Sequence, residues 1–261
     1  MRAVIPYRIR IPGTWVTTGD TQEDSDIWRC LNLAQSAFAE ASLALGGFVT
    51  AGPTMPTPTE YRAELAERNA IETTVRREFG VSDFDPPREN VVEIETDCRM
   101  IAQKFGKGIL PRSVAHHLPF LYAKAFVYVL DEFRRHLASL ERFGSVTCTA
   151  TSARAELAAL LPDLEQVRHS VAHVDERAQW LGPLKKTLDP KPVTTRMLNA
   201  PAGGVVEISQ LDGDDLCCTM GDGRQGRVPV NREAFDGCVA IYQKLVDNIR
   251  WKGPPSVEPH W

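Results

Sequence analysis

Apolar residues recur every three or four positions along much of the chain, a spacing that is typical of amphipathic α-helices. The clearest case runs from Val114 to Leu140, where the spacing holds throughout and Gly144 follows as a stop signal. The same pattern predicts further helices at about residues 25–45, 59–79, 91–105 and 152–181. Pro162 lies inside the last of these segments, so we expect that helix to kink or to restart there.

Downstream of Pro192 the apolar positions come in short runs separated by turns rich in glycine and aspartate, as in antiparallel hairpins. Three such runs, GGVVEISQL, DDLCCTM and GRVPV, predict a small β-meander. A helix is then predicted to begin after the cap residue Asn231, and the tail KGPPSVEPHW is expected to be loosely held. Near the N-terminus, AVIPYRIRIP alternates apolar and charged residues and predicts a short strand that is a candidate to join the meander.

These elements predict a mainly α fold, α+β overall: a helical bundle with an appended small antiparallel β-meander and a C-terminal helix. We place the bundle, with the possible N-terminal strand, at residues 1–192 and the meander with its closing helix at residues 193–261. A chain of 261 residues is long enough to bury one large core, or a main core and a small one.

Composition and charge narrow the classes of function. The net charge of −4 and the pI near 5.9 provide no overall positive field for nucleic acid, so any recognition of phosphate has to be local. The N-terminal residues lack the apolar segment of a secretion signal, and no run approaches 18 apolar residues, so we expect a cytoplasmic location and no membrane partner. The six cysteines form no C-x-x-C pair and are expected to be reduced.

The candidate chemistry lies in one segment, EQVRHSVAHVDERAQW, residues 165–180. Arg168 and His173 are five positions apart, about 140° around a helix, so they do not share a face, although arginine is long enough to reach a site beside His173. His169 and His173 are four positions apart and are predicted to share a face.

The residues RHSVAH, from Arg168 to His173, resemble the R-x4-6-H motif of the HEPN superfamily, in which a polar residue often follows the arginine. His169 occupies that position here. The resemblance covers the helical part of the chain, roughly residues 91–181, and implies a HEPN-like helical bundle. Members with the motif are typically metal-independent endoribonucleases that act as homodimers, with two motifs at one composite site. The resemblance therefore implies RNA or a nucleotide as ligand, no cofactor and no metal; a role as toxin or defence effector with a cognate inhibitor protein follows by family analogy alone.

The residue types suit that reaction. RNA can be cleaved with its own 2′-hydroxyl group as nucleophile, so the protein has to supply a proton acceptor and a cation for the developing charge. His173 fits the role of general base or acid, because an imidazole titrates near neutral pH. Arg168 can donate two hydrogen bonds to phosphate oxygens, and His169 can orient a phosphate or carry a second proton.

A second copy of the motif competes with the first. Arg112 to His117, RSVAHH, also fits R-x4-H, but it precedes Pro119 in a region where a helix starts. We prefer Arg168 and His173, because they are predicted to lie on a regular helix.

Two further interpretations stay open. His169, His173 and Glu176 are spaced to share one helix face and could bind a metal ion, with His116, His117 or Asp131 as an added ligand. Alternatively, the bundle is a non-catalytic module that binds nucleotides or proteins. In that case the histidines line the edge of the core and Arg168 forms an ordinary ion pair.

Overall fold

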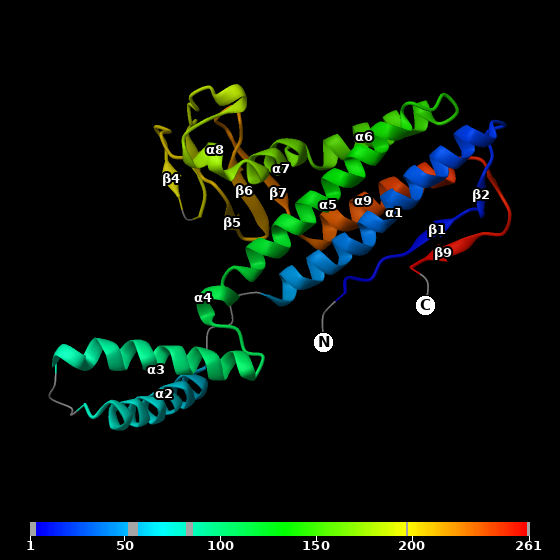
Figure 1. Ribbon diagram of the computed structural model, residues 1–261. Coiled ribbons are helices and arrows are strands. Elements are labelled where there is room, and N and C mark those ends of the chain that lie inside the picture. Colours follow the sequence, from blue (N-terminus) through cyan, green and yellow to red (C-terminus); the bar gives the residue numbers. More distant parts are fainter. Residues whose placement is uncertain (1–3, 52–56, 82–85, 197, 260–261) are drawn as a thin grey trace. The chain divides into compact units, whose positions relative to one another are not determined.

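A computed structural model of the chain describes residues 4–51, 57–81, 86–196 and 198–259 (Figure 1). The described chain is mainly α-helical with small antiparallel sheets, which confirms the predicted fold class. It divides into two compact units. We call them the main unit (Met1–Thr50 with Pro119–Trp261) and the insert unit (Ala51–Leu118).

This division does not coincide with the boundary predicted at residues 192–193. The meander and the C-terminal helix pack into the same hydrophobic core as the helices that precede them in sequence. The segment 91–181, which resembles a HEPN core, begins in the insert unit and ends in the main unit.

The main unit is built on long helices that lie side by side (Figure 1). Its helices are α1 (Thr21–Thr50), α5 (Leu118–Leu140), α6 (Thr147–Leu160), α7 (Leu164–Ala172), α8 (Val174–Ala178) and α9 (Arg232–Asp247). Phe38 of α1 lies at the centre of an aromatic cluster, with its ring centroid 4.9 Å from that of Phe133 on α5 and 5.3 Å from that of Tyr242 on α9. The apolar faces that the spacing predicted on these helices are therefore buried against one another.

Two of the predicted helices are interrupted at identifiable residues. The segment predicted from Val114 onward is split into one turn, α4 (Arg112–Ala115), and α5, which has Pro119 in its first turn. The segment predicted at residues 152–181 starts earlier, at Thr147, and breaks before Pro162. Proline lacks a backbone N–H and is tolerated in a first turn, whereas it ends a helix that is already running.

Helix α1 is longer than predicted because two glycines continue it. A side chain at Gly47 would place its Cβ 2.5 Å from the ring of Tyr122 on α5. Glycine therefore allows the two helices to approach closely at this point.

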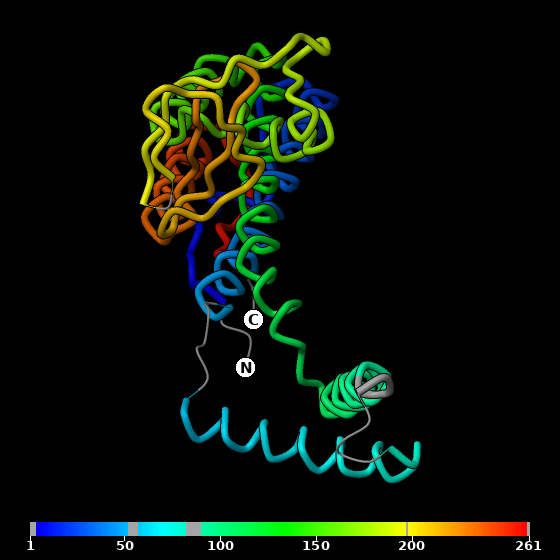
Figure 2. The backbone as a smooth tube through the Cα atoms, turned by 90° about the vertical axis from the view of Figure 1, so that its left-hand side faces the viewer, coloured from blue at the N-terminus to red at the C-terminus, as the bar shows by residue number. Residues whose placement is uncertain are grey.

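The predicted meander is present in the main unit. Strands β5 (Gln210–Asp212), β6 (Asp215–Thr219) and β7 (Gln225–Pro229) form an antiparallel sheet in the order β5-β6-β7, and the sheet lies against α7 (Figures 1 and 2). Two shorter strands, β3 (Val193–Thr194) and β4 (Asn199–Ala200), form a hairpin beyond the 3-10 turn Pro183–Lys185.

All six cysteines are free, as predicted. The adjacent pair on β6, Cys217 and Cys218, is buried on both faces of the sheet. Burial raises the pKa of Cys217 to about 11 and that of Cys218 to about 12, so neither thiol is a nucleophile at neutral pH.

The two ends of the chain pair with each other. Strand β1 (Ile9–Ile11) pairs with β9 (Ser256–Glu258), and β2 (Trp15–Val16) pairs with β8 (Trp251–Lys252). The expectations that the N-terminal strand joins the meander and that the tail is loosely held are therefore wrong. The side-chain amide of Gln243 on α9 fixes the N-terminal strand, since it both accepts from Arg10 N (2.8 Å) and donates to Arg10 O (2.9 Å).

The insert unit is a pair of helices, α2 (Pro58–Phe79) and α3 (Pro86–Gly106), followed by the single turn α4. A capping box between Thr57 and Glu60 starts α2, and Gly80 ends it in the left-handed conformation. Val75, Val81 and Val92 form its small buried cluster.

Candidate functional site

The motif segment is not one regular helix. Arg168 and His169 lie on α7, but α7 ends at Ala172. His173 is its C-cap, with φ −112° and ψ 48°, and a short second helix, α8, begins at the next residue. The prediction of a regular helix through the whole motif is therefore wrong. The break turns the His173 side chain outward at a helix end, where 42% of it is exposed.

The two histidines lie together, as their spacing predicted. Their rings stack with centroids 4.4 Å apart and an interplanar angle of 29°. Beside them, Nδ1 of His173 lies 3.8 Å from Oε1 of Glu176. This distance is too long for a hydrogen bond, so the carboxylate lies beside the His173 ring without a direct bond to it.

Arg168 is held against α5. Its Nε atom is buried and lies 3.5 Å from Oδ2 of Asp131, a distance for an ion pair rather than a short hydrogen bond. Its guanidinium carbon lies 5.1 Å from the centroid of the Tyr128 ring, within range of a cation–π contact. Helix α5 therefore fixes the direction of the Arg168 side chain.

Asp131 is the centre of an arginine cluster that the sequence analysis missed. Its side chain is 3% exposed, and its carboxylate also contacts Nε of Arg134 at 2.7 Å and Nε of Arg135 at 3.3 Å. Arg134 also contacts Glu165 of α7 at 3.2 Å. The sequence considered Asp131 as a metal ligand, whereas the structure shows it as the anion among three cations. The sequence could have indicated two of these ion pairs, because arginines follow Asp131 at positions i+3 and i+4, which is the spacing of ion pairs on a helix.

Arg177 is a second residue that the sequence left without a role. Its side chain is 1% exposed, and Nη1 donates to the carbonyl oxygen of Leu181 at 2.5 Å. Nη1 also lies 3.8 Å from Oε2 of Glu176. The Glu176 carboxylate is thus placed between the buried Arg177 and the exposed His173.

The surroundings of the histidine pair favour the neutral form of His169. Burial lowers the pKa of His169, and the nearby charges of His173, Arg177 and Arg168 lower it further, against an opposing effect of Glu176. We expect an NMR titration of the histidine ring protons to place the pKa of His169 below its ordinary value of about 6.5. The variant His169→Gln assigns the signal by removing it.

The same shift has a consequence for stability. The unfolded chain keeps the ordinary pKa of about 6.5, so below that pH it takes up a proton more readily than the folded chain, and the His169 contribution to stability is lost as pH falls. His169→Gln should flatten this acid-side slope in urea unfolding. A pKa of His169 at or above the ordinary value, or an unchanged slope, would contradict this account of the site.

The competing motif copy is arranged differently. Arg112, in the insert unit, is bonded to Glu64 of α2. His117 is exposed after α4, and its ring meets that of His116 edge to face with centroids 6.0 Å apart. The structure thus places this copy on a single turn and a connection, as the sequence suggested. It provides a matched histidine for control experiments.

The structure gives no support to the metal interpretation. Within the described residues, no group of three or more His, Cys, Asp or Glu side chains is placed to hold a metal ion. His169 and His173 stack face to face, and the Glu176 carboxylate lies beside His173, with its Oε1 atom 3.8 Å from Nδ1.

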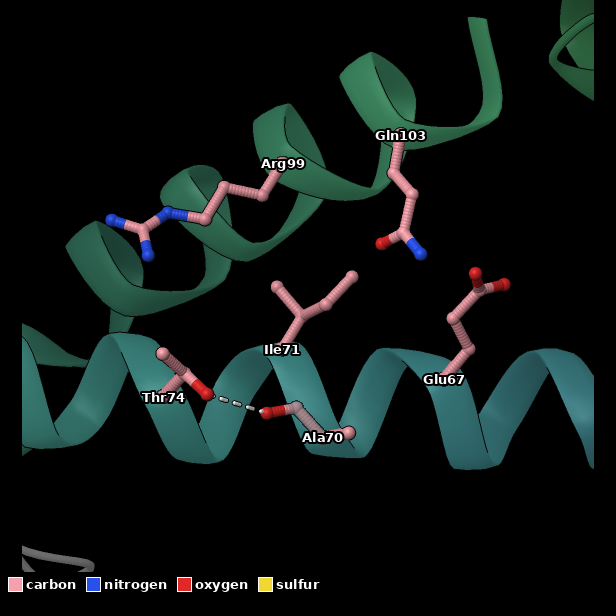
Figure 3. A pocket seen from close by; sticks show the side chains of 6 residues that line it. All are labelled: Glu67, Ala70, Ile71, Thr74, Arg99 and Gln103. Atoms are coloured by element: carbon pink, nitrogen blue, oxygen red, sulfur yellow. Dashed lines mark hydrogen bonds between the residues drawn. The ribbon is translucent and has the colours of Figure 1, made fainter. Parts of the chain in front are cut away.

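A groove of about 360 Å³ lies between α2 and α3 in the insert unit (Figure 3). Figure 3 shows Ile71 of α2 pointing toward α3, while the guanidinium of Arg99 turns along the helix, away from Gln103. Arg99 contacts Glu78 at 2.6 Å and Glu95 at 2.7 Å. The other charged lining residue, Glu67, contacts Lys107 at 2.7 Å, so both charged groups of the groove are in ion pairs and we assign no chemistry to it.

No family model, curated protein or solved structure matches this chain. None of the helices in the described ranges has the length and apolar character required to cross a bilayer.

Proposed function

We propose that this chain is a metal-independent endoribonuclease of the HEPN type. The observation that carries the proposal is the His173 imidazole, exposed at a helix break, stacked on His169 and backed by the Glu176 carboxylate. Arg168 lies on the preceding turn with its guanidinium held in a fixed direction. Cleavage by the 2′-hydroxyl requires a proton acceptor and a cation, and we assign these roles to His173 and Arg168.

In the proposed reaction, Nε2 of His173 accepts the proton of the 2′-hydroxyl group as its oxygen attacks the adjacent phosphorus atom. The bond from phosphorus to the 5′-oxygen breaks, and that oxygen takes up a proton from a second imidazole. The products are a 2′,3′-cyclic phosphate and a 5′-hydroxyl end. The second imidazole is His173 of another copy in a homodimer.

Arg168 supplies the positive charge in this scheme. Asp131 faces its Nε atom, so the Nη side of the guanidinium is the side that meets phosphate oxygens. Arg134 and Arg135 add positive charge around the same carboxylate.

The test is cleavage of a mixed RNA substrate in EDTA by the full chain, with analysis of the new ends. We expect 2′,3′-cyclic phosphate ends, and a loss of at least about 100-fold in rate for His173→Ala, the usual contribution of a general base. His117→Ala, in the competing motif copy, should cleave like the wild type. Light scattering of the same samples measures whether the active species is a dimer.

A non-catalytic module is the second candidate, and one observation favours it. The Nε atom of Arg168 is buried against Asp131 and the guanidinium packs on Tyr128, which is how a structural arginine is held. Under this alternative the protein binds RNA, a nucleotide or a protein partner without cutting it. Equal cleavage by wild type and His173→Ala would indicate a contaminant, and no cleavage by a folded dimer would decide for the module.

A further inference from the structure

Within the main unit, the paired chain ends and helices α1 and α9 form a cleft of about 290 Å³. Three aromatic side chains line it: Trp28 of α1, Tyr242 of α9 and Trp251 of β8. Polar groups lie among them, namely the amides of Asn32 and Gln35 and the carboxylate of Glu258. None of these residues belongs to the candidate site on α7 and α8.

The polar atoms of two of the aromatic residues are already engaged elsewhere. The indole N–H of Trp251 donates to the carbonyl oxygen of Val246 at 2.7 Å. The hydroxyl group of Tyr242 donates to the carbonyl oxygen of Leu31 at 2.9 Å. Tyr242 is fully buried, so it forms part of the floor of the cleft, whereas Trp251 offers ring surface that is apolar and carries the negative face of an aromatic quadrupole.

Trp28 is fixed in a different way. The ring of Trp15, from β2, stacks on it with centroids 6.3 Å apart and an interplanar angle of 30°. Trp28 is nevertheless 40% exposed. An indole that is half-exposed, braced by a second indole and set at the edge of a cleft is available to a ligand without a large loss of side-chain entropy.

The charge of the cleft has one sign. Glu258 is the one charged side chain among the described residues that line it. The negative charge of Glu258 also acts on Tyr7. The pKa of the Tyr7 hydroxyl group is raised mainly by burial and further by the Glu258 carboxylate. The side-chain amides of Asn32 and Gln35 show no hydrogen bond within the described chain, so they remain available for ligand polar groups.

We propose that this cleft binds a small methylated ammonium ion, held by cation–π contact with Trp28 and Trp251 and by the negative charge of Glu258. Aromatic faces with a nearby carboxylate are the recurring solution for such cations, which are too weakly hydrated to need a full set of hydrogen-bond acceptors. The volume lies at the small end of ligand pockets, which suits a ligand of this size. A phosphate or carboxylate ligand would be repelled by Glu258. This inference does not depend on the proposed ribonuclease function.

The first experiment compares choline with dimethylbutanol, in which carbon replaces the charged nitrogen and the shape is retained. Binding to the full chain is measured by calorimetry and by the change in tryptophan fluorescence. We expect saturable binding of choline and an affinity at least about tenfold lower for the uncharged analogue. Equal affinity for the two compounds, or no saturable binding of choline, would overturn the proposal.

Variants then locate the site. Trp28→Leu should weaken choline binding about tenfold, Trp28→Phe should weaken it less, and Glu258→Gln should weaken it and remove its salt dependence. Leu33→Ala, an exposed position on the same helix, is the matched control and should bind like the wild type. Unchanged binding by folded Trp28→Leu would place the ligand elsewhere and refute the assignment.

A third arm identifies the source of the cation. Choline represents a free metabolite, and an amide of trimethyllysine represents a modified protein side chain. Tighter binding of choline supports a free ligand, and tighter binding of the lysine derivative supports a modified side chain. Absence of binding by both compounds refutes the proposal.

Discussion

Phe38→Ala is expected to destabilise the main unit by about 3–5 kcal/mol, the usual cost of emptying a buried phenylalanine site. Phe38 is fully buried, and its ring lies within 6.4 Å, between centroids, of rings from four other residues. These rings belong to the N-terminal segment, α5 and α9. The cavity left by alanine would therefore open where three separate stretches of the chain meet, and no single side chain there can fill it.

Urea unfolding followed by tryptophan fluorescence measures this effect selectively. All five tryptophans belong to the main unit, so the signal reports on that unit and not on α2 and α3. Leu43→Ala is the matched control, since Leu43 lies on α1 with 51% of its surface exposed and should cost no more than about 0.5 kcal/mol. Equal losses for the two variants would mean that α1 does not pack into the core as described.

The aromatic cluster also shows what sequence periodicity can predict. The spacing of apolar residues identified the helices and their buried faces, because a helix with one apolar stripe can satisfy both its backbone and its side chains only by burying that stripe. Helix ends were predicted less well. Pro162 broke its helix as expected, whereas the glycines at the end of α1 did not stop it, and Gly47 lets Tyr122 of α5 approach closely.

The pairing of the chain ends could not be predicted in the same way. Strands β1 and β9 each have three residues and are separated by almost the whole chain. A tail with prolines and no alternating pattern carries no local signal for a strand. Its structure depends on the partner strand β1, which the amide of Gln243 holds through Arg10, and both are supplied by tertiary packing.

The candidate site was predicted in part for similar reasons. Local spacing was sufficient to place His169 and His173 on one face. The break at His173 and the burial of Arg177 are not indicated by any pattern within the segment. The ion pair between Arg168 and Asp131 joins residues 37 positions apart in sequence, on different helices.

Asp131→Ala is expected to cost about 3 kcal/mol of stability, because it removes the anion from a buried ion-pair cluster and leaves the cations without it. The carboxylate is 3% exposed and contacts Arg134, Arg135 and Arg168. Glu132→Ala removes the same charge one residue further along α5. Glu132 is half-exposed and its ion-pair partner among the described residues is Arg135, at 3.8 Å, so the substitution should cost well under 1 kcal/mol. Similar losses for both variants would contradict the central position of Asp131.

Asp131 also separates the structural role of Arg168 from a catalytic one. Arg168→Met keeps an unbranched side chain close in size to the aliphatic part of arginine, but removes the charge and the guanidinium group that packs on Tyr128. If Arg168 is only an anchor for Asp131, the substitutions Asp131→Ala and Arg168→Met should show a coupling of about 1–3 kcal/mol in a double-mutant cycle of stability. The rate of RNA cleavage should then fall only as far as the folded fraction of the protein falls.

If Arg168 acts on phosphate, Arg168→Met should reduce the cleavage rate of protein that remains fully folded. Asp131→Ala should then reduce that rate less than Arg168→Met, because it releases the guanidinium from its fixed direction but leaves it in place.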